Sequence, residues 1–252
     1  MFSQITMAVP DHASIAKFYR QTLGMTDQRD GLGYDAQQAH INFLQRAVPA
    51  YKSDEFYWKI GITVANLDAA ANYLRRSDVS ISAPRQFADI GYMAYCRDPA
   101  GATIELLQQY PRGRERDVGD VGDGHPVADG AILAHLTLRV RDLTAAQAWC
   151  ADQGLRLLSV EALESYGFSL YFYAYQQETP QRDTVAGANH LAWLWQRPYT
   201  LLEIQHLHVA GPRPTESKRL IALSARASTD APALGNSKTS ESLSLPLTGL
   251  NV

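Results

Sequence analysis

Three segments of this 252-residue chain begin and end alike. Their first stretches read QITMAVPD from Gln4, KIGITVAN from Lys59 and HLTLRVRD from His135, and their last stretches read HINFLQ, TIELLQ and LLEIQH. Within each segment, strand-like alternation gives way to apolar residues at helical spacing and then returns to strands. A unit that repeats in this way buries its apolar face against a neighbouring unit. The sequence therefore predicts an α+β protein built from three βαβββ modules.

The boundaries between the modules follow from composition. Residues 1–56 and 57–110 are expected to form a paired N-terminal domain, and residues 131–210 form the third module. The intervening residues 111–130 are rich in Gly, Pro, Asp and Arg and have no apolar period, which is typical of a linker. From residue 211 the chain is dominated by Ser, Thr, Pro and Ala, so we expect a largely flexible tail to residue 252, with a possible short helix over residues 218–226.

The charge and apolar content exclude several classes of protein. A net charge of -3 lacks the basic stripe that a nucleic-acid-binding protein needs. No run approaches the roughly 20 apolar residues of a membrane-spanning helix, and the N-terminus has no signal-peptide pattern. We therefore expect a cytoplasmic protein. Cys96 and Cys150 lie too far apart in the sequence for metal spacing, and two cysteines make no disulfide framework.

Two polar positions stand out in the third module. In the strand from His135, alternation places His135, Thr137 and Arg139 on one face. Near the end of the module, Glu203 lies within an apolar run, where a carboxylate without a partner would cost several kcal/mol. Glu203 should therefore have a cation, a hydrogen-bond donor or a metal ion beside it.

Further segments carry a resemblance to a known superfamily. The stretch DPAGATIEL at residues 98–106 is similar to a strand-turn-strand signature of the vicinal-oxygen-chelate superfamily, which includes glyoxalases, bleomycin-resistance proteins and extradiol dioxygenases. In the third module, LAHLTLRVRDL, GFSLYFYAY and WLWQRPYTLLEIQH resemble the first half of the glyoxalase I family. The resemblance implies that each module supplies one metal ligand from the start of its first strand and one Glu from its last strand. Two modules facing each other would complete the site.

Carried onto this sequence, the resemblance gives the third module an intact pair, His135 and Glu203. Imidazole and carboxylate suit a divalent ion such as Zn, Ni or Co. The third module has no fourth module to face, so we expect a homodimer that brings two such pairs together. The alternative is that Glu105 or Gln4 from the N-terminal domain completes the site.

The other two modules depart from the pattern. The matching residues are Gln4 and Asn42 in the first module and Lys59 and Glu105 in the second. The Lys59 ammonium could neutralise Glu105 with no metal at all. We expect residues 1–110 to keep the fold and to be catalytically degenerate.

The resemblance implies a metal-dependent lyase of the glyoxalase I type. Glu203 would move a proton through a metal-bound enediolate, and Arg139 would bind the glutathione part of a 2-oxoaldehyde adduct, although Leu207 replaces the family's Asn near that position. Two alternatives stay open: an Fe-dependent extradiol dioxygenase, which needs two His and one carboxylate, and a metal-free protein that binds a small molecule. The aromatic residues between 166 and 199 are expected to pack in the sheet, with one or two lining an apolar pocket.

Overall fold

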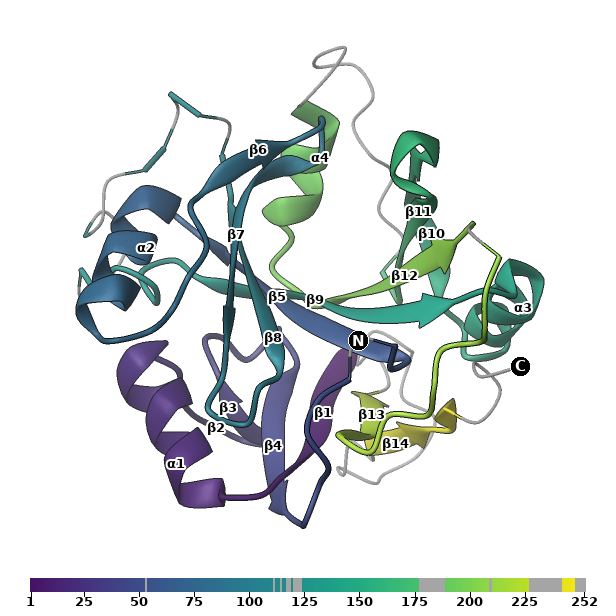
Figure 1. The fold of residues 1–252 in the computed structure, drawn as a ribbon, viewed down its shortest axis with the longest axis horizontal. Coiled ribbons are helices and arrows are strands. Elements are labelled where there is room, and N and C mark those ends of the chain that lie inside the picture. Colours follow the sequence, from purple (N-terminus) through teal and green to yellow (C-terminus); the bar gives the residue numbers. More distant parts are fainter. Residues whose placement is uncertain are drawn as a thin grey trace, which may run out of the picture.

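The computed structural model describes residues 1–52, 54–110, 112–113, 115–116, 119, 124–176, 189–208, 210–226 and 242–247. Three βαβββ modules follow one another along the chain, as the repeats predict, and the fold class is α+β (Figure 1). None of the described helices is long and apolar enough to cross a membrane.

Each module has the same order of elements. The first contains β1 (Phe2–Val9), α1 (His12–Lys17) with the π-helical turn Phe18–Thr22, β2 (Thr26–Gln28), β3 (Gly31–Gly33) and β4 (His40–Gln45). The second contains β5 (Tyr57–Val64), α2 (Leu67–Arg76), β6 (Arg85–Phe87), β7 (Gly91–Arg97) and β8 (Thr103–Gln108). The third contains β9 (Ile132–Val140), α3 (Leu143–Asp152), β10 (Arg156–Leu163), the 3-10 turn Glu164–Tyr166, β11 (Phe168–Ala174), α4 (Asn189–Trp195) and β12 (Leu201–Leu207).

The module helices begin at side chains that cap their free N–H groups. Asp11, Asn66 and Asp142 accept hydrogen bonds from backbone N–H groups in the first turns of α1, α2 and α3. The apolar stripe of α2, which includes Leu67 and Leu74, is buried.

The pairing of the modules differs from the prediction. The second and third modules share one eight-stranded sheet in the order β10-β11-β12-β9-β5-β8-β7-β6. Its two halves meet where β5 pairs antiparallel with β9. The expected pairing of residues 1–56 with 57–110 in one sheet is therefore wrong, because the edge of β5 pairs with β9 instead of with the first module.

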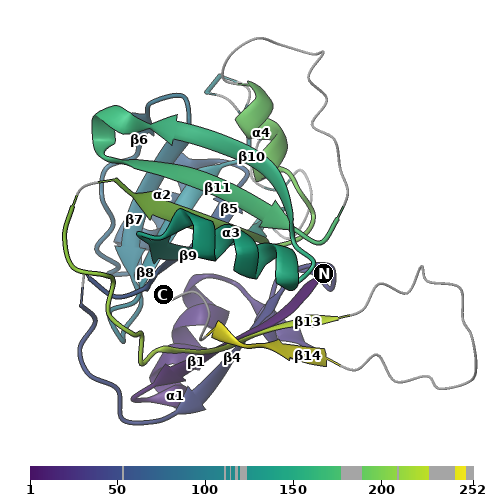
Figure 2. The ribbon, with the colours of Figure 1, turned by 90° about the vertical axis from the view of Figure 1, so that its right-hand side faces the viewer.

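The first module pairs with part of the C-terminal segment. In the six-stranded sheet β14-β13-β1-β4-β3-β2, β1 pairs antiparallel with β13 (Leu220–Arg226), which in turn pairs with β14 (Ser242–Leu245). The short helix expected over residues 218–226 is a strand, and this part of the tail is held in the fold (Figure 2). A strand edge left open exposes unpaired backbone groups, and β13 satisfies those of β1. The remaining tail residues, 227–241 and 248–252, and part of the linker lie outside the described residues.

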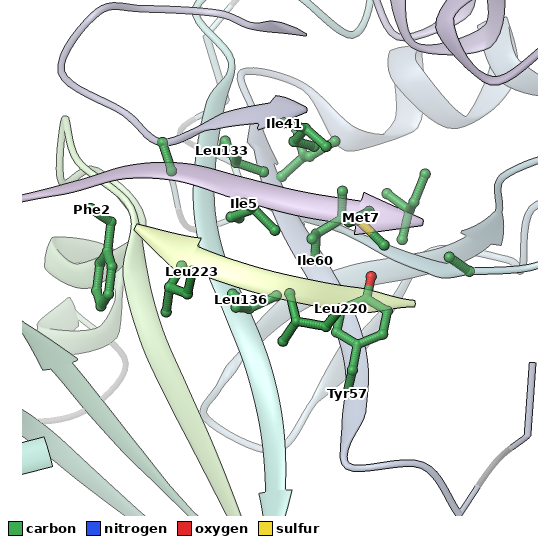
Figure 3. Close-up of a cluster of buried hydrophobic side chains, with 14 of the residues drawn as sticks. Phe2, Ile5, Met7, Ile41, Tyr57, Ile60, Leu133, Leu136, Leu220 and Leu223 are labelled. Atoms are coloured by element: carbon green, nitrogen blue, oxygen red, sulfur yellow. The ribbon is translucent and has the colours of Figure 1, made fainter. Parts of the chain in front are cut away.

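The main core lies between the two sheets. Figure 3 shows Ile5 of β1 and Leu223 of β13 facing Ile60 of β5 and Leu136 of β9. These side chains are at most 1% exposed. One face of the eight-stranded sheet is thus buried against the first module, which leaves the opposite face at the β5–β9 junction to carry polar residues.

Candidate active site

Four ionisable side chains meet on that opposite face, one from each of the four central strands of the eight-stranded sheet. They are Lys59 on β5, Glu105 on β8, His135 on β9 and Glu203 on β12. The strand register explains why they meet, since Lys59 and Glu203 both pair with Thr137, while Glu105 and His135 both pair with Gly61. All four are buried, with exposures of 3% or less.

The Lys59 ammonium lies at the centre of this group. Its Nζ is 2.5 Å from Glu105 Oε2, 3.3 Å from Glu203 Oε1 and 3.3 Å from His135 Nε2. Burial alone would lower the pKa of Lys59, but the two carboxylates outweigh it and raise the pKa, so the side chain is an ammonium at neutral pH. The expectation that Lys59 could neutralise Glu105 is confirmed by their ion pair.

Glu105 is surrounded by donors. Its Oε2 accepts from Lys59 and lies 3.1 Å from His135 Nε2, and its Oε1 accepts from the Tyr95 hydroxyl at 2.5 Å. Burial raises the pKa of Glu105, but Lys59 and His135 outweigh this effect and hold the pKa well below its usual range. Glu105 is therefore a fixed anion with both oxygens occupied.

Glu203 is less fully bonded. Its Oε1 accepts from the Thr137 hydroxyl at 2.9 Å and lies near Lys59, so the predicted donor and cation are both present. Its Oε2 accepts no hydrogen bond from the described residues, and His135 Nε2 lies 3.7 Å from it, beyond hydrogen-bond distance. Glu203 thus keeps one oxygen with free acceptor capacity.

The position of His135 depends on a glycine and on irregular strand pairing. A Cβ at Gly61 would lie 2.0 Å from the imidazole, so the ring occupies space that only glycine leaves open. The register between β5 and β9 shifts on both sides of this point, with Trp58 and Ala134 as the extra residues. A bulge redirects a side chain, and here it brings the Trp58 ring 4.8 Å from Lys59 Nζ, although the two residues are sequence neighbours.

A cavity of about 290 Å³ opens above the charged group. Lys59, Glu105 and Glu203 line it, and Arg85 contributes a second cation. The other lining residues are aromatic or apolar: Trp58, Phe87, Ile90, Met93, Tyr95, Tyr166, Phe168, Leu170 and Trp195. A small site with mostly apolar walls and a few converging polar groups is typical of a pocket for a small molecule.

The sequence only partly predicted these walls. Of the aromatic residues between 166 and 199, one or two were expected to line an apolar pocket, and Tyr166, Phe168 and Trp195 line the cavity. Trp195 lies on α4, a helix that the strand-like reading of this region missed, and its ring packs 5.7 Å from that of His135. In Figure 1, α4 lies between β6–β7 and β10–β11, over the site face of the sheet.

Two further predicted residues lie outside the charged group. Arg139 stacks on Trp58 at 4.2 Å, donates from its Nε to Gln205 and is not among the residues that line the cavity. Gln4 belongs to the other sheet, where its amide donates to the Asp30 carbonyl. Of the two residues proposed to complete the His135–Glu203 pair, the structure brings Glu105 to the site and not Gln4.

The donor set does not fit a divalent metal ion. A histidine that binds a metal almost always donates its other ring N–H to an acceptor. The Nδ1 atom of His135 is buried and has no hydrogen-bond partner among the described residues. An ammonium also stands within contact of all three donor side chains. Within the described part of the chain, no group of three or more His, Cys, Asp or Glu residues is arranged to hold a metal.

Comparison with known proteins agrees with the fold. Residues 2–106 match the model of the Glyoxalase/Bleomycin resistance protein/Dioxygenase superfamily. The crystal structure of glyoxalase I from Zea mays is similar over 87% of this chain and 70% of that chain, with a TM-score of 0.59 and 17% identity. A V278E mutant of the same maize enzyme gives a TM-score of 0.61 at 16% identity, over 88% and 72% of the two chains. No curated protein sequence matches.

Residues 2–106 therefore carry the sequence pattern of this superfamily, and the fold of the chain resembles that of glyoxalase I. At this level of identity the likeness concerns the fold, and the chemistry must be argued from the side chains of this chain.

Proposed function

We propose that this protein is a lyase or isomerase that holds the reacting carbonyl group of its substrate in the cavity and moves a proton with Glu203, without a metal ion. The observation that carries the proposal is the contrast between the two buried carboxylates. Glu105 has donors on both oxygens, whereas Glu203 lines the cavity and keeps Oε2 free of any described donor within hydrogen-bond distance. A general base needs such a free lone pair.

The same residues account for the charge that the reaction creates. When Glu203 removes a proton from the carbon beside a carbonyl group, the electron pair moves to the carbonyl oxygen as an enolate. The Lys59 ammonium, 3.3 Å from Glu203, lies where it can stabilise that oxygen. In a substrate that carries a hydroxyl group on that carbon, such as a 2-oxoaldehyde–thiol adduct, the hydroxyl group passes its proton to the enolate oxygen and becomes the new carbonyl group. Protonated Glu203 returns its proton to the former carbonyl carbon. A positioned base contributes about 10²–10⁴-fold to such a reaction.

This proposal keeps part of the prediction from sequence. The reaction class and the role of Glu203 are retained. The metal-bound enediolate is not, because the donor set does not fit a metal. An extradiol dioxygenase would need a second histidine at the site, and the other three side chains of the group are Lys59, Glu105 and Glu203. The contact of Arg139 with glutathione stays a prediction. The homodimer also stays a prediction, although the third module now pairs with the second module of the same chain and does not need a second chain for this purpose.

The test is turnover of the methylglyoxal–glutathione adduct by protein dialysed against EDTA, followed as thioester formation. We expect activity that added Zn²⁺ or Ni²⁺ does not raise, and that falls by about 10²–10³-fold in Glu203→Gln. Glu216→Gln is the matched control, since this carboxylate is exposed and does not line the cavity. Activity that appears only with added metal, or equal activity in Glu203→Gln, would refute the mechanism.

The aromatic walls favour a second candidate, a protein that sequesters a small hydrophobic ligand. Trp58 and Trp195 both line the cavity, so their fluorescence reports its occupancy. Saturable quenching by 2-naphthol that is unchanged in Glu203→Gln, together with no turnover of the adduct, would support this second function over the first.

A further inference from the structure

We infer that Lys59 is the resident cation of this site: its ammonium occupies the point on which three metal-type donors converge, and it excludes a divalent ion that those donors would otherwise hold. The inference concerns the three donors and Lys59 alone. It does not rest on the proposed proton transfer, and its test measures no turnover.

The donor atoms around His135 are spaced much like ligands of one metal ion. His135 Nε2 is 3.1 Å from Glu105 Oε2 and 3.7 Å from Glu203 Oε2. Ligand atoms bound tetrahedrally at about 2.1 Å from one Zn²⁺ ion are about 3.4 Å apart. The two distances from His135 are therefore close to those within a metal ligand set, and an ammonium is in contact with each of the three donors.

The positive charge of Lys59 also keeps a divalent ion out of the site. Lys59 is 3% exposed and its ammonium lies between two carboxylates, which hold it at this point. A divalent ion entering beside it would meet a buried positive charge within about 4 Å, where repulsion is strong in a medium of low dielectric constant. Replacing the ammonium with a neutral side chain removes this repulsion and leaves two carboxylates and one imidazole without a cation. Those groups are typical ligands of Zn²⁺ and Ni²⁺.

The experiment compares wild type, Lys59→Gln and Lys59→Arg after dialysis against a chelator, with Zn²⁺ or Ni²⁺ alone added in a calorimetric titration. We expect Lys59→Gln to bind one ion per chain roughly 100-fold more tightly than wild type, a difference of about 2.7 kcal/mol. Lys59→Arg conserves the charge and should bind like wild type.

Adventitious binding needs its own control. The rings of His206 and His208 lie 5.0 Å apart, outside the charged group, and these two imidazoles could bind a metal ion of their own. The double variant Lys59→Gln/His135→Ala keeps that pair and removes one proposed ligand. The additional tight site should be absent from the double variant.

Thermal unfolding supplies a second readout. An ion that binds the folded state raises the unfolding midpoint, so Zn²⁺ should raise the midpoint of Lys59→Gln and leave those of wild type and Lys59→Arg unchanged. A folded Lys59→Gln that binds metal no more tightly than wild type would overturn the inference. A tight metal site in wild type that His135→Ala abolishes would also overturn the inference. This comparison needs no Lys59 variant, so it is decisive even if Lys59→Gln proves too unstable to titrate.

Discussion

The first strands of the three modules meet antiparallel partners at two junctions in this protein, and the two junctions differ in chemistry. At the junction of β5 with β9, Lys59 lies opposite Thr137, and Gly61 lies opposite His135. At the junction of β1 with β13, the matching positions Gln4 and Thr6 lie opposite Ser224 and Ala222. The backbone pairing is alike, but only the first junction places charged groups at these matching positions.

What lies beyond each partner strand explains the difference. Next to β9 lies β12, the last strand of a complete module, and it brings Glu203 to the site. Next to β13 lies only the short strand β14. A pair of complete modules therefore supplies four functional positions, whereas the tail supplies backbone hydrogen bonds and apolar cover. The first module acts as a structural support for the site-bearing sheet.

The largest expected effect separates the two junctions directly. Lys59→Met should lower the free energy of unfolding by about 3–5 kcal/mol, because it leaves the buried carboxylates of Glu105 and Glu203 without their cation. Gln4→Met, at the matching position of the first module, should cost about 2 kcal/mol, because Gln4 donates to the Asp30 carbonyl and accepts from the Thr6 hydroxyl, and one hydrogen bond usually contributes about 1 kcal/mol. Urea unfolding of both variants measures the difference. Equal losses of unfolding free energy would mean that the charged group contributes no more to stability than the hydrogen bonds of Gln4.

Leu223→Ala tests whether the first module only supports the site. Leu223 lies opposite Ile5 and is 1% exposed, so its truncation should lower the unfolding free energy by about 2–4 kcal/mol. The cavity should keep its shape, since Leu223 packs on the other face of the eight-stranded sheet (Figure 3). Binding of 2-naphthol in the cavity, followed by tryptophan fluorescence, should therefore be unchanged. Leu243→Ala, at a position 68% exposed on β14, is the control for both measurements.

Sequence repetition predicted the elements well and their assembly poorly. The shared starts at Gln4, Lys59 and His135 located the first strand of every module, because alternation and flanking turn residues are local signals. Which strand edges then meet is a long-range choice, and the sequence order of the modules does not determine it. The tail shows the same limit, since the apolar run of β13 was outweighed by the Ser- and Thr-rich composition around it.

The site shows a similar division. Family positions identified Lys59, Glu105, His135 and Glu203 one module at a time, and burial of Glu203 predicted a cation or a donor beside it. That all four belong to one group follows only from the β5–β9 pairing. The role of Gly61 was also out of reach, because a glycine in a strand does not reveal which side chain fills the space above it.

The smallest of these effects concerns that glycine. In Gly61→Ala the new methyl group would overlap the His135 ring, so the imidazole or the strand must shift, at a cost of about 1–3 kcal/mol in unfolding free energy. The His135 imidazole resonances, assigned by comparison with His135→Ala, should move. Gly91→Ala is the matched control: its added Cβ would lie 3.4 Å from Trp195, an ordinary contact beside the same cavity, and should cost less than about 1 kcal/mol. The opposite result is that Gly61→Ala leaves both the unfolding free energy and the His135 resonances unchanged. In that case the close approach of β5 and β9 at Gly61 does not position the His135 imidazole.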